Sequence, residues 1–302
     1  MNDQDHERSP VESPQWLTYL NTRIEEEKEE AFPEDLYYEI IRDMLLQSED
    51  SEKAVSQAID RFYKHYVAGF SRGNFGGREP PEYEAGAELN SISTIVFETI
   101  AEIPFADPKQ DILSRFILGI AKNAADEFDE KNPQFVCYIW GIQTAAVGRW
   151  NAYHVSTGPG DYERPGVTEA IDIWLSTSAL IAKLFQADLL GEYGPLWASA
   201  DFRDALEERT DGDLTTLPFK RAQILAAADY ISLSGEVFAR EAKDSSKTRS
   251  YKLNAARWKS WAAKFQEVSD KIGEDVGLGL KQRAKEAHDR MVELYPEAFN
   301  LD

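Results

Sequence analysis

The chain has 302 residues, 42% of them hydrophobic and 29% charged, a balance that is typical of globular proteins and argues against overall disorder. Lys and Arg number 33 against 54 Asp and Glu, so the net charge of −21 opposes binding to nucleic-acid phosphates and to anionic lipid surfaces. The single cysteine excludes an intramolecular disulfide, and no run approaches the ~18 apolar residues of a membrane helix. Because the N-terminus is also too polar for a signal peptide, we expect a soluble protein of the cytoplasm or nucleus.

The first part of the chain is predicted to be a tail followed by helices. Residues 1–14 are polar, contain Ser and Pro, and are expected to be disordered. Residues 15–71 form a predicted N-terminal helical part. Within it, Trp16, Leu20 and Ile24 are spaced four residues apart, which places them on one face of a helix.

A loop and a larger helical region follow. Residues 72–89 contain four glycines and two prolines, so we expect an exposed loop there. Residues 90–296 are predicted to form the main helical domain, packed with the N-terminal part as one unit. Asp107 is expected to cap a helix, with Gln110 completing a capping box. Later helices are expected at about Thr168 to Leu190, Pro195 to Glu208, Pro218 to Ala242, Ser250 to Asp270 and Leu278 to Tyr295.

The pattern as a whole predicts an all-α fold. Strict alternation of apolar and polar residues, which would indicate strands, is not found in any segment. No period repeats along the chain, so a repeat solenoid is not supported. We therefore expect an irregular bundle of about ten helices.

Ordinary catalytic and metal-binding motifs are missing from the sequence. The four histidines lie far apart, and none has a Cys or Glu at metal-ligand spacing. Cys137 lies in an apolar segment, where burial keeps a thiol unreactive. We accordingly predict no metal, no cofactor and no catalytic residue.

Two segments remain as candidate contact sites. The first contains Arg203 and Glu207, which are i, i+4 neighbours if the segment is helical. The second lies within residues 243–264, which hold seven basic residues and one acidic residue although the chain is acidic. We expect this basic stretch to face acidic helices of the same chain.

Within the basic stretch, Trp258, Trp261 and Phe265 share one helix face, with Arg257 and Lys259 beside them. This spacing predicts that the aromatic side chains belong to the core and that the cations lie at its edge. The alternative is an exposed aromatic groove, rimmed by cations, that takes an acidic or phosphorylated partner.

These segments together resemble a fungal protein family known only as a domain of unknown function. The shared features are an Ile-Pro-x-x-Asp-Pro-x-Gln segment, a Trp-led helix, an Arg-Asp-Ala-Leu-Glu segment, an Ala-rich helix and an Arg-Trp-x-x-Trp segment. In this chain they lie at Ile103 to Gln110, Trp174 to Leu184, Arg203 to Glu207, Ala226 to Ile231 and Arg257 to Trp261.

The resemblance extends roughly from Ile92 to Met291 and departs from the family pattern at two positions. Lys183 stands where the family usually has Arg, and Tyr230 stands where it has Trp. A lysine cannot replace the two-pronged hydrogen bonding of an arginine, so any anchor at that position is weakened. The family implies one helical domain and a fungal source, and it brings no activity, cofactor or catalytic residue.

Two functions are therefore expected as alternatives. The first is a non-catalytic, soluble helical interaction or regulatory protein whose partner is another protein. The second is an enzyme or small-ligand-binding protein with a site built from dispersed Asp, Glu, Arg and Trp residues. A deep pocket with convergent polar groups would favour the second, and a filled core would favour the first.

Overall fold

The structure is a computed structural model that describes residues 13–47, 50–71, 82–122, 138–153, 167–208, 214, 217–244, 251, 253–273, 277 and 279–300. These residues form eleven α-helices and no strand, which confirms the predicted all-α fold. None of the helices in the described ranges is both long enough and apolar enough to cross a membrane. In chain order the elements are α1 Gln15–Glu27, α2 Asp35–Leu46, α3 Ser51–Ser71, α4 Glu82–Ala101, α5 Lys109–Lys122, α6 Tyr138–Tyr153, α7 Val167–Gln186, α8 Tyr193–Arg203, the π-helix η5 Asp204–Glu208, α9 Pro218–Lys243, α10 Ala255–Lys271, α11 Leu280–Leu294 and the short 3₁₀-helix η6 Pro296–Phe299.

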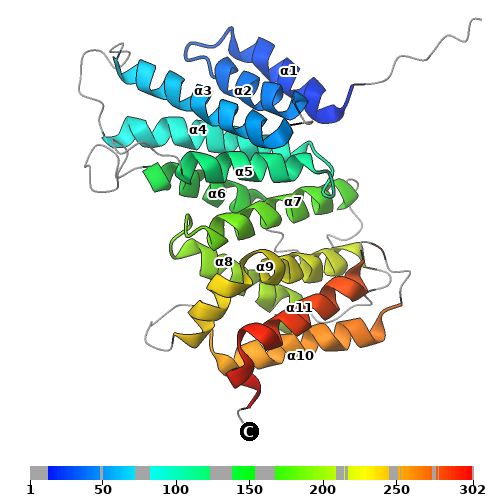
Figure 1. Cartoon of the computed structure of the whole chain (residues 1–302). Helices are drawn as coiled ribbons and strands as arrows, with labels where there is room; N and C mark the ends of the chain where they lie inside the picture. The colour runs from blue at the N-terminus through cyan, green and yellow to red at the C-terminus, as the bar shows by residue number, and fades with distance from the viewer. Residues whose placement is uncertain are drawn as a thin grey trace, which may run out of the picture.

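The helices are stacked along one direction of an elongated molecule. Figure 1 shows α1, α2 and α3 at one end and α10 and α11 at the other. Between these ends, α4 packs mainly on α6, and α7 packs mainly on α9, while α11 packs on both α9 and α10. Each helix thus buries its apolar face against its neighbours in the stack.

The central helix α9 is buried on most of its surface, and it is kinked near its middle. Ser234 has φ −139° and ψ 16°, which departs from helical geometry. Its Oγ donates a hydrogen bond to the Tyr230 carbonyl at 2.9 Å. A serine that bonds back to the carbonyl four residues earlier often bends a helix, so this contact accounts for the kink.

Glu98 of α4 connects the N-terminal helices to the rest of the stack. Its carboxylate accepts hydrogen bonds from the Tyr19 hydroxyl of α1 at 2.9 Å and from the Tyr38 hydroxyl of α2 at 3.2 Å. The same carboxylate forms an ion pair with Arg149 of α6. Burial raises the pKa of Tyr38 to about 12, so this hydroxyl stays protonated and donates at neutral pH. The packing of residues 15–71 with the main domain as one unit remains a prediction.

The predicted start of α5 is correct in one part and wrong in the other. Asp107 Oδ1 accepts the Lys109 backbone N–H at 2.9 Å, as expected of a capping residue. The Gln110 side chain does not complete a capping box, because the Asp107 backbone N–H that it would accept donates to the Pro104 carbonyl at 2.9 Å. The Gln110 amide itself donates to the Ile103 carbonyl at 2.9 Å and to Ser176 Oγ of α7 at 2.7 Å.

The loop predicted at 72–89 ends earlier than expected, because α4 already begins at Glu82. Gly86 suggested a loop, but one glycine costs a helix only about 1 kcal/mol and the flanking alanines favour helix. Residues 72–81, nearly all of the predicted tail and Cys137 lie outside the described residues.

Candidate functional site

Glu207 joins the two candidate segments that the sequence indicated. Its carboxylate receives two hydrogen bonds from Arg257, Nε to Oε1 at 2.6 Å and Nη2 to Oε2 at 2.8 Å. The Trp261 indole N–H also donates to Oε1, at 2.6 Å. Arg257 in turn lies over the Trp261 ring, with Cζ 4.9 Å from the ring centroid. The paired hydrogen bonds and the cation–π contact fix the arginine in one orientation.

The aromatic face of α10 is part of the core. Trp258, Trp261 and Phe265 are fully buried. Trp261 packs on Phe202 of α8 with ring centroids 4.7 Å apart, and the Trp258 indole N–H donates to the Met291 carbonyl of α11 at 3.0 Å. This confirms the prediction that the aromatics are core. The alternative of an exposed aromatic groove is wrong, because neighbouring helices cover all three rings.

Glu207 reaches α10 from an unusual turn of the backbone. Arg203 ends α8, and residues 204–208 continue as the π-helix η5. The wider turn of a π-helix changes the direction of the side chains that follow it, and such turns are frequent at functional sites. Arg203 Nε lies 3.4 Å from Asp204 Oδ1, while Glu207 binds Arg257.

A buried lysine satisfies backbone carbonyls at the start of this turn. Lys220 of α9 is only 5% exposed. Its ammonium donates to the Ala205 carbonyl at 2.8 Å and to the Asp204 carbonyl at 3.4 Å. Carbonyls that lose their regular helical partners need other donors, so Lys220 stabilises the π-helical geometry.

The charge of Glu207 is stabilised where it lies. The hydrogen bonds from Arg257 lower the pKa of the carboxyl below its usual value, and partial burial opposes this effect. The positive charge of Arg257, the Trp261 N–H and the nearby Arg203 lower the pKa further. Glu207 is therefore ionised at neutral pH and acts as an acceptor and ion-pair partner.

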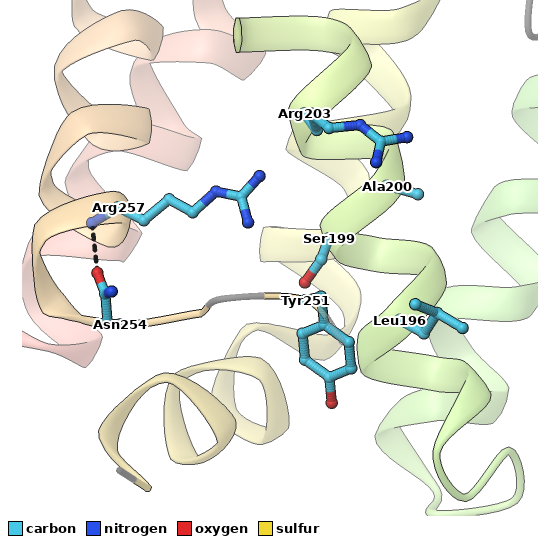
Figure 2. A pocket seen from close by; sticks show the side chains of 7 residues that line it. All are labelled: Leu196, Ser199, Ala200, Arg203, Tyr251, Asn254 and Arg257. Atoms are coloured by element: carbon cyan, nitrogen blue, oxygen red, sulfur yellow. Dashed lines mark hydrogen bonds between the residues drawn. The ribbon is translucent and has the colours of Figure 1, made fainter. Parts of the chain in front are cut away.

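An open cleft lies between α8 and the start of α10, beside the Glu207–Arg257 pair. Its volume is about 670 Å³, within the range of roughly 300–1,000 Å³ that is common for ligand sites. Figure 2 shows the Arg257 side chain extending from the first turn of α10 towards α8, which carries Ser199 and Arg203. The lining residues are Leu196, Ser199, Ala200, Arg203, Tyr251, Asn254 and Arg257.

Hydrogen-bond donors predominate among the polar side chains of this cleft. Ser199 is 2% exposed, and its hydroxyl has no hydrogen-bond partner among the residues that the structure describes. Asn254 caps α10 by accepting the Arg257 backbone N–H at 2.9 Å, which places the helix N-terminus at the edge of the cleft. A helix N-terminus favours negative charge. The cleft thus combines Ser199 with two guanidinium groups, each of which has a carboxylate beside it, Asp204 for Arg203 and Glu207 for Arg257.

The other basic residues of α10 lie outside the cleft. Lys259 is exposed on the helix surface. Lys264 pairs with Glu267 of the same helix at 3.0 Å. Arg257 forms an ion pair with another element, Glu207 of η5.

The two departures from the family pattern occupy packed positions. Lys183 of α7 donates to Ser114 Oγ at 3.2 Å and lies 3.3 Å from Asp111 Oδ1, so it links α7 to α5. Tyr230 of α9 is fully buried, and burial together with the nearby Asp201 carboxylate raises its pKa. Lys183 therefore still forms an anchor, through single contacts to each partner.

The structure brings together Arg203, Glu207, Arg257 and Trp261, which belong to two segments that the sequence indicated as separate candidates. Sequence reasoning missed the cleft itself and the contributions of Ser199 and Tyr251. Asn254 could have been found, because an Asn directly before a helical pattern is a typical capping signal. No local signal pairs residues 196–203 with residues 251–257, since their proximity depends on the packing of α8 against α10.

One comparison with known proteins found a match. A family model described as "Protein of unknown function (DUF3632)" matches residues 94–265, which is more than half of the chain and includes α8, η5 and most of α10. No curated protein and no solved structure is significantly similar to the chain.

Proposed function

The chain belongs to the DUF3632 family of proteins of unknown function, and for this member we propose a non-catalytic role as a helical protein that binds an acidic segment of a partner protein. The observation that carries this proposal is the cleft between α8 and α10, which is lined by arginine side chains from both helices.

The chemistry of the lining supports an acidic ligand. Arg203 and Arg257 are rich in N–H donors, and the Ser199 hydroxyl lies just beneath the surface of the cleft. The hydrocarbon surfaces of Leu196 and Tyr251 add apolar contact, as in most protein ligand sites.

The same lining argues against the alternative of an enzyme. None of the seven lining side chains is a carboxylate or an imidazole, so none is a suitable general base near neutral pH. The nearby carboxylate, Glu207, is held by Arg257 and Trp261. Among the residues that the structure describes, Ser199 has no partner that would activate it as a nucleophile. Binding without bond chemistry accounts for all of these features.

Two finer parts of the proposal concern the setting of the protein. The order of the family segments and the acidic, single-cysteine composition support a fungal protein that acts in the cytoplasm or nucleus.

The experiment is a binding titration with a defined probe. A fluorescein-labelled octaglutamate peptide is titrated with the full chain, and its anisotropy is recorded. We expect binding that Arg203→Gln weakens about tenfold, because a charge-assisted hydrogen bond contributes about 1.5–3 kcal/mol. Arg203 is chosen because its side chain is 42% exposed, whereas loss of Arg257 would also release Glu207.

Lys53→Gln serves as the matched control. Lys53 is exposed on α3, far from the cleft along the stack, and its neutralisation changes the net charge by the same amount. An equal loss of affinity in Lys53→Gln would show that binding follows overall charge and would contradict the proposal. Absence of any octaglutamate binding to the wild-type chain would do so as well.

A further inference from the structure

The two arginines of the cleft are bound to their carboxylates in different ways. Arg257 donates to both oxygens of Glu207, at 2.6 and 2.8 Å, and the Arg257 side chain is 21% exposed. Arg203 Nε lies 3.4 Å from Asp204 Oδ1, and the Arg203 side chain is 42% exposed. Two short bonds to one carboxylate hold an arginine more firmly than a longer contact does. Arg203 is therefore the more accessible of the two, and Arg257 is the one held by an internal carboxylate.

The Glu207 side chain can leave Arg257 without disturbing the fold around it. It is 32% exposed, so water can hydrate the carboxylate once it has moved away. The backbone of η5 is fixed separately, because Lys220 donates to the Ala205 carbonyl at 2.8 Å. Asp204, by contrast, is only 7% exposed, so its carboxylate cannot turn into water as easily. Movement of one side chain, that of Glu207, is enough to release its two bonds to Arg257.

Arg257 keeps its position when Glu207 leaves. Its Cζ lies 4.9 Å from the ring centroid of Trp261, which is itself fully buried. The ring therefore serves as a rigid support for the guanidinium group. A carboxylate that enters the cleft can then accept the same pair of N–H groups that Glu207 accepted, in the same paired geometry.

We propose that Glu207 is an internal competitor for Arg257, which it occupies in the free protein and yields to an acidic ligand that enters the cleft. Glu207 thereby sets the affinity of the cleft for such ligands. This inference rests on the proposed function, because it describes how the proposed acidic-segment site is regulated. The ligand contacts the accessible Arg203 and completes its binding when its carboxylate replaces that of Glu207 on Arg257.

Such competition predicts that affinity rises when Glu207 loses its charge. A partly exposed ion pair favours its closed arrangement by about two- to fivefold, and the apparent dissociation constant rises by the same factor if only the open arrangement binds. Glu207→Gln keeps an oxygen that can accept the Trp261 N–H but loses the charge and one acceptor for Arg257. We expect fluorescein-labelled octaglutamate to bind this variant about two- to fivefold more tightly than the wild type. Equal or weaker binding would overturn the inference.

Glu267→Gln is the matched control on α10. Glu267 pairs with Lys264 at 3.0 Å and with Lys271 at 2.6 Å. It follows Arg257 by ten residues, which corresponds to roughly 15 Å along a helix. Its neutralisation changes the net charge by the same amount, but charges more than about 8 Å apart are largely screened at physiological ionic strength. The octaglutamate affinity should therefore stay at the wild-type value. A gain equal to that of Glu207→Gln would show that overall charge controls binding and would contradict the competition.

A double-mutant cycle separates competition for Arg257 from simple repulsion of the ligand by Glu207. In the Arg257→Gln background the competitor has no guanidinium to occupy, so adding Glu207→Gln should leave the octaglutamate affinity unchanged. If the second substitution still increases affinity as much as it does in the wild type, Glu207 acts through space and the inference is wrong. Thermal melts check that each variant is folded.

If Arg257→Gln is misfolded or binds too weakly to measure, two indole N–H resonances decide. The Trp261 N–H donates to Glu207, and the Trp258 N–H donates to the Met291 carbonyl. In ¹H–¹⁵N spectra of the wild-type chain, saturating octaglutamate should shift the Trp261 resonance, because its acceptor moves, and leave the Trp258 resonance in place. A Trp261 resonance that stays unchanged while the peptide is bound would rule out displacement of Glu207.

Failure of this inference can be told apart from failure of the proposed function. If the wild-type chain binds octaglutamate through Arg203 and Glu207→Gln binds it no more tightly, the cleft takes an acidic segment and Glu207 only orients Arg257. If neither the wild-type chain nor Glu207→Gln binds the peptide, the proposed function fails and the inference fails with it.

Discussion

Replacing Trp261 with alanine tests how much this buried ring contributes to the free energy of unfolding. The indole is fully buried between Phe202, at 4.7 Å, and Phe238, at 6.1 Å between ring centroids. A buried tryptophan removes about 200 Å² of mostly apolar surface from water, which corresponds to about 5 kcal/mol at 25 cal/mol per Å². This value is an upper bound, because the unfolded chain already buries part of its surface.

The hydrogen bond from Trp261 to Glu207 adds little to that value. Glu207 keeps its two bonds to Arg257, and its side chain is 32% exposed, so water replaces the lost N–H. We therefore expect Trp261→Ala to lower the free energy of unfolding by about 3–5 kcal/mol, as is usual when a core Trp is truncated. For a chain of this size the melting temperature should fall by about 10 °C.

The assay is urea unfolding followed by circular dichroism, with thermal melts beside it. Lys259→Glu is the control on the same helix and should change the unfolding free energy by less than about 1 kcal/mol, because Lys259 is exposed. An unshifted melt of Trp261→Ala would refute the reasoning and would mean that this ring does not support the core. Equal losses in both variants would refute it too, by showing that charge and not packing dominates on α10.

Glu207→Gln should lower stability at pH 7 by at most about 1 kcal/mol, because the Glu207–Arg257 pair is partly exposed. The pKa of Glu207 is lowered in the folded state, so ionised Glu207 stabilises the fold above the unfolded pKa of about 4.3, and this stabilisation is lost as pH falls through the folded pKa. The unfolding free energies of wild type and variant should therefore converge in acid. A difference that persists there would contradict this account. Gly194→Ala should cost about 1–3 kcal/mol in denaturant unfolding, because a new Cβ would lie 2.8 Å from Cγ of Phe185 in a buried contact. Gly148→Ala is the matched control in an exposed part of α6, where a new Cβ would have no neighbour within 4 Å among the described residues. It should stabilise the chain by about 0.5–1 kcal/mol. Equal effects of the two changes would be inconsistent with the packing described.

The elements with strong apolar periodicity could be predicted closely. The helix expected from Pro218 to Ala242 is α9, which ends at Lys243. The stripe of Trp16, Leu20 and Ile24 is buried as its spacing indicated. These predictions succeeded because period and helix-start signals are local, and tertiary packing reinforced them.

The features that failed or were missed depend on contacts between distant segments. Gln110 was expected to complete a capping box, but the Asp107 N–H donates to the Pro104 carbonyl, and the Gln110 amide contacts Ser176 of α7. The segment from Asp204 to Glu208 reads as a continuation of an α-helix, and its π-helical turn depends on Lys220 and on the partners of Glu207. The cleft is likewise a product of packing, since α8 and the start of α10 are about 50 residues apart in sequence.

The hydrogen bond from Trp258 to the Met291 carbonyl has a practical consequence for work on this family. The family match ends at residue 265, within α10, and starts at residue 94, within α4. A fragment trimmed to those limits would lose α11, leaving the Trp258 indole N–H without its acceptor and uncovering apolar surface of α9 and α10. At the other end, Glu98 would lose Tyr19 and Tyr38. Recombinant fragments cut at the match boundaries should therefore aggregate, whereas the full chain retains the helices that cover both ends.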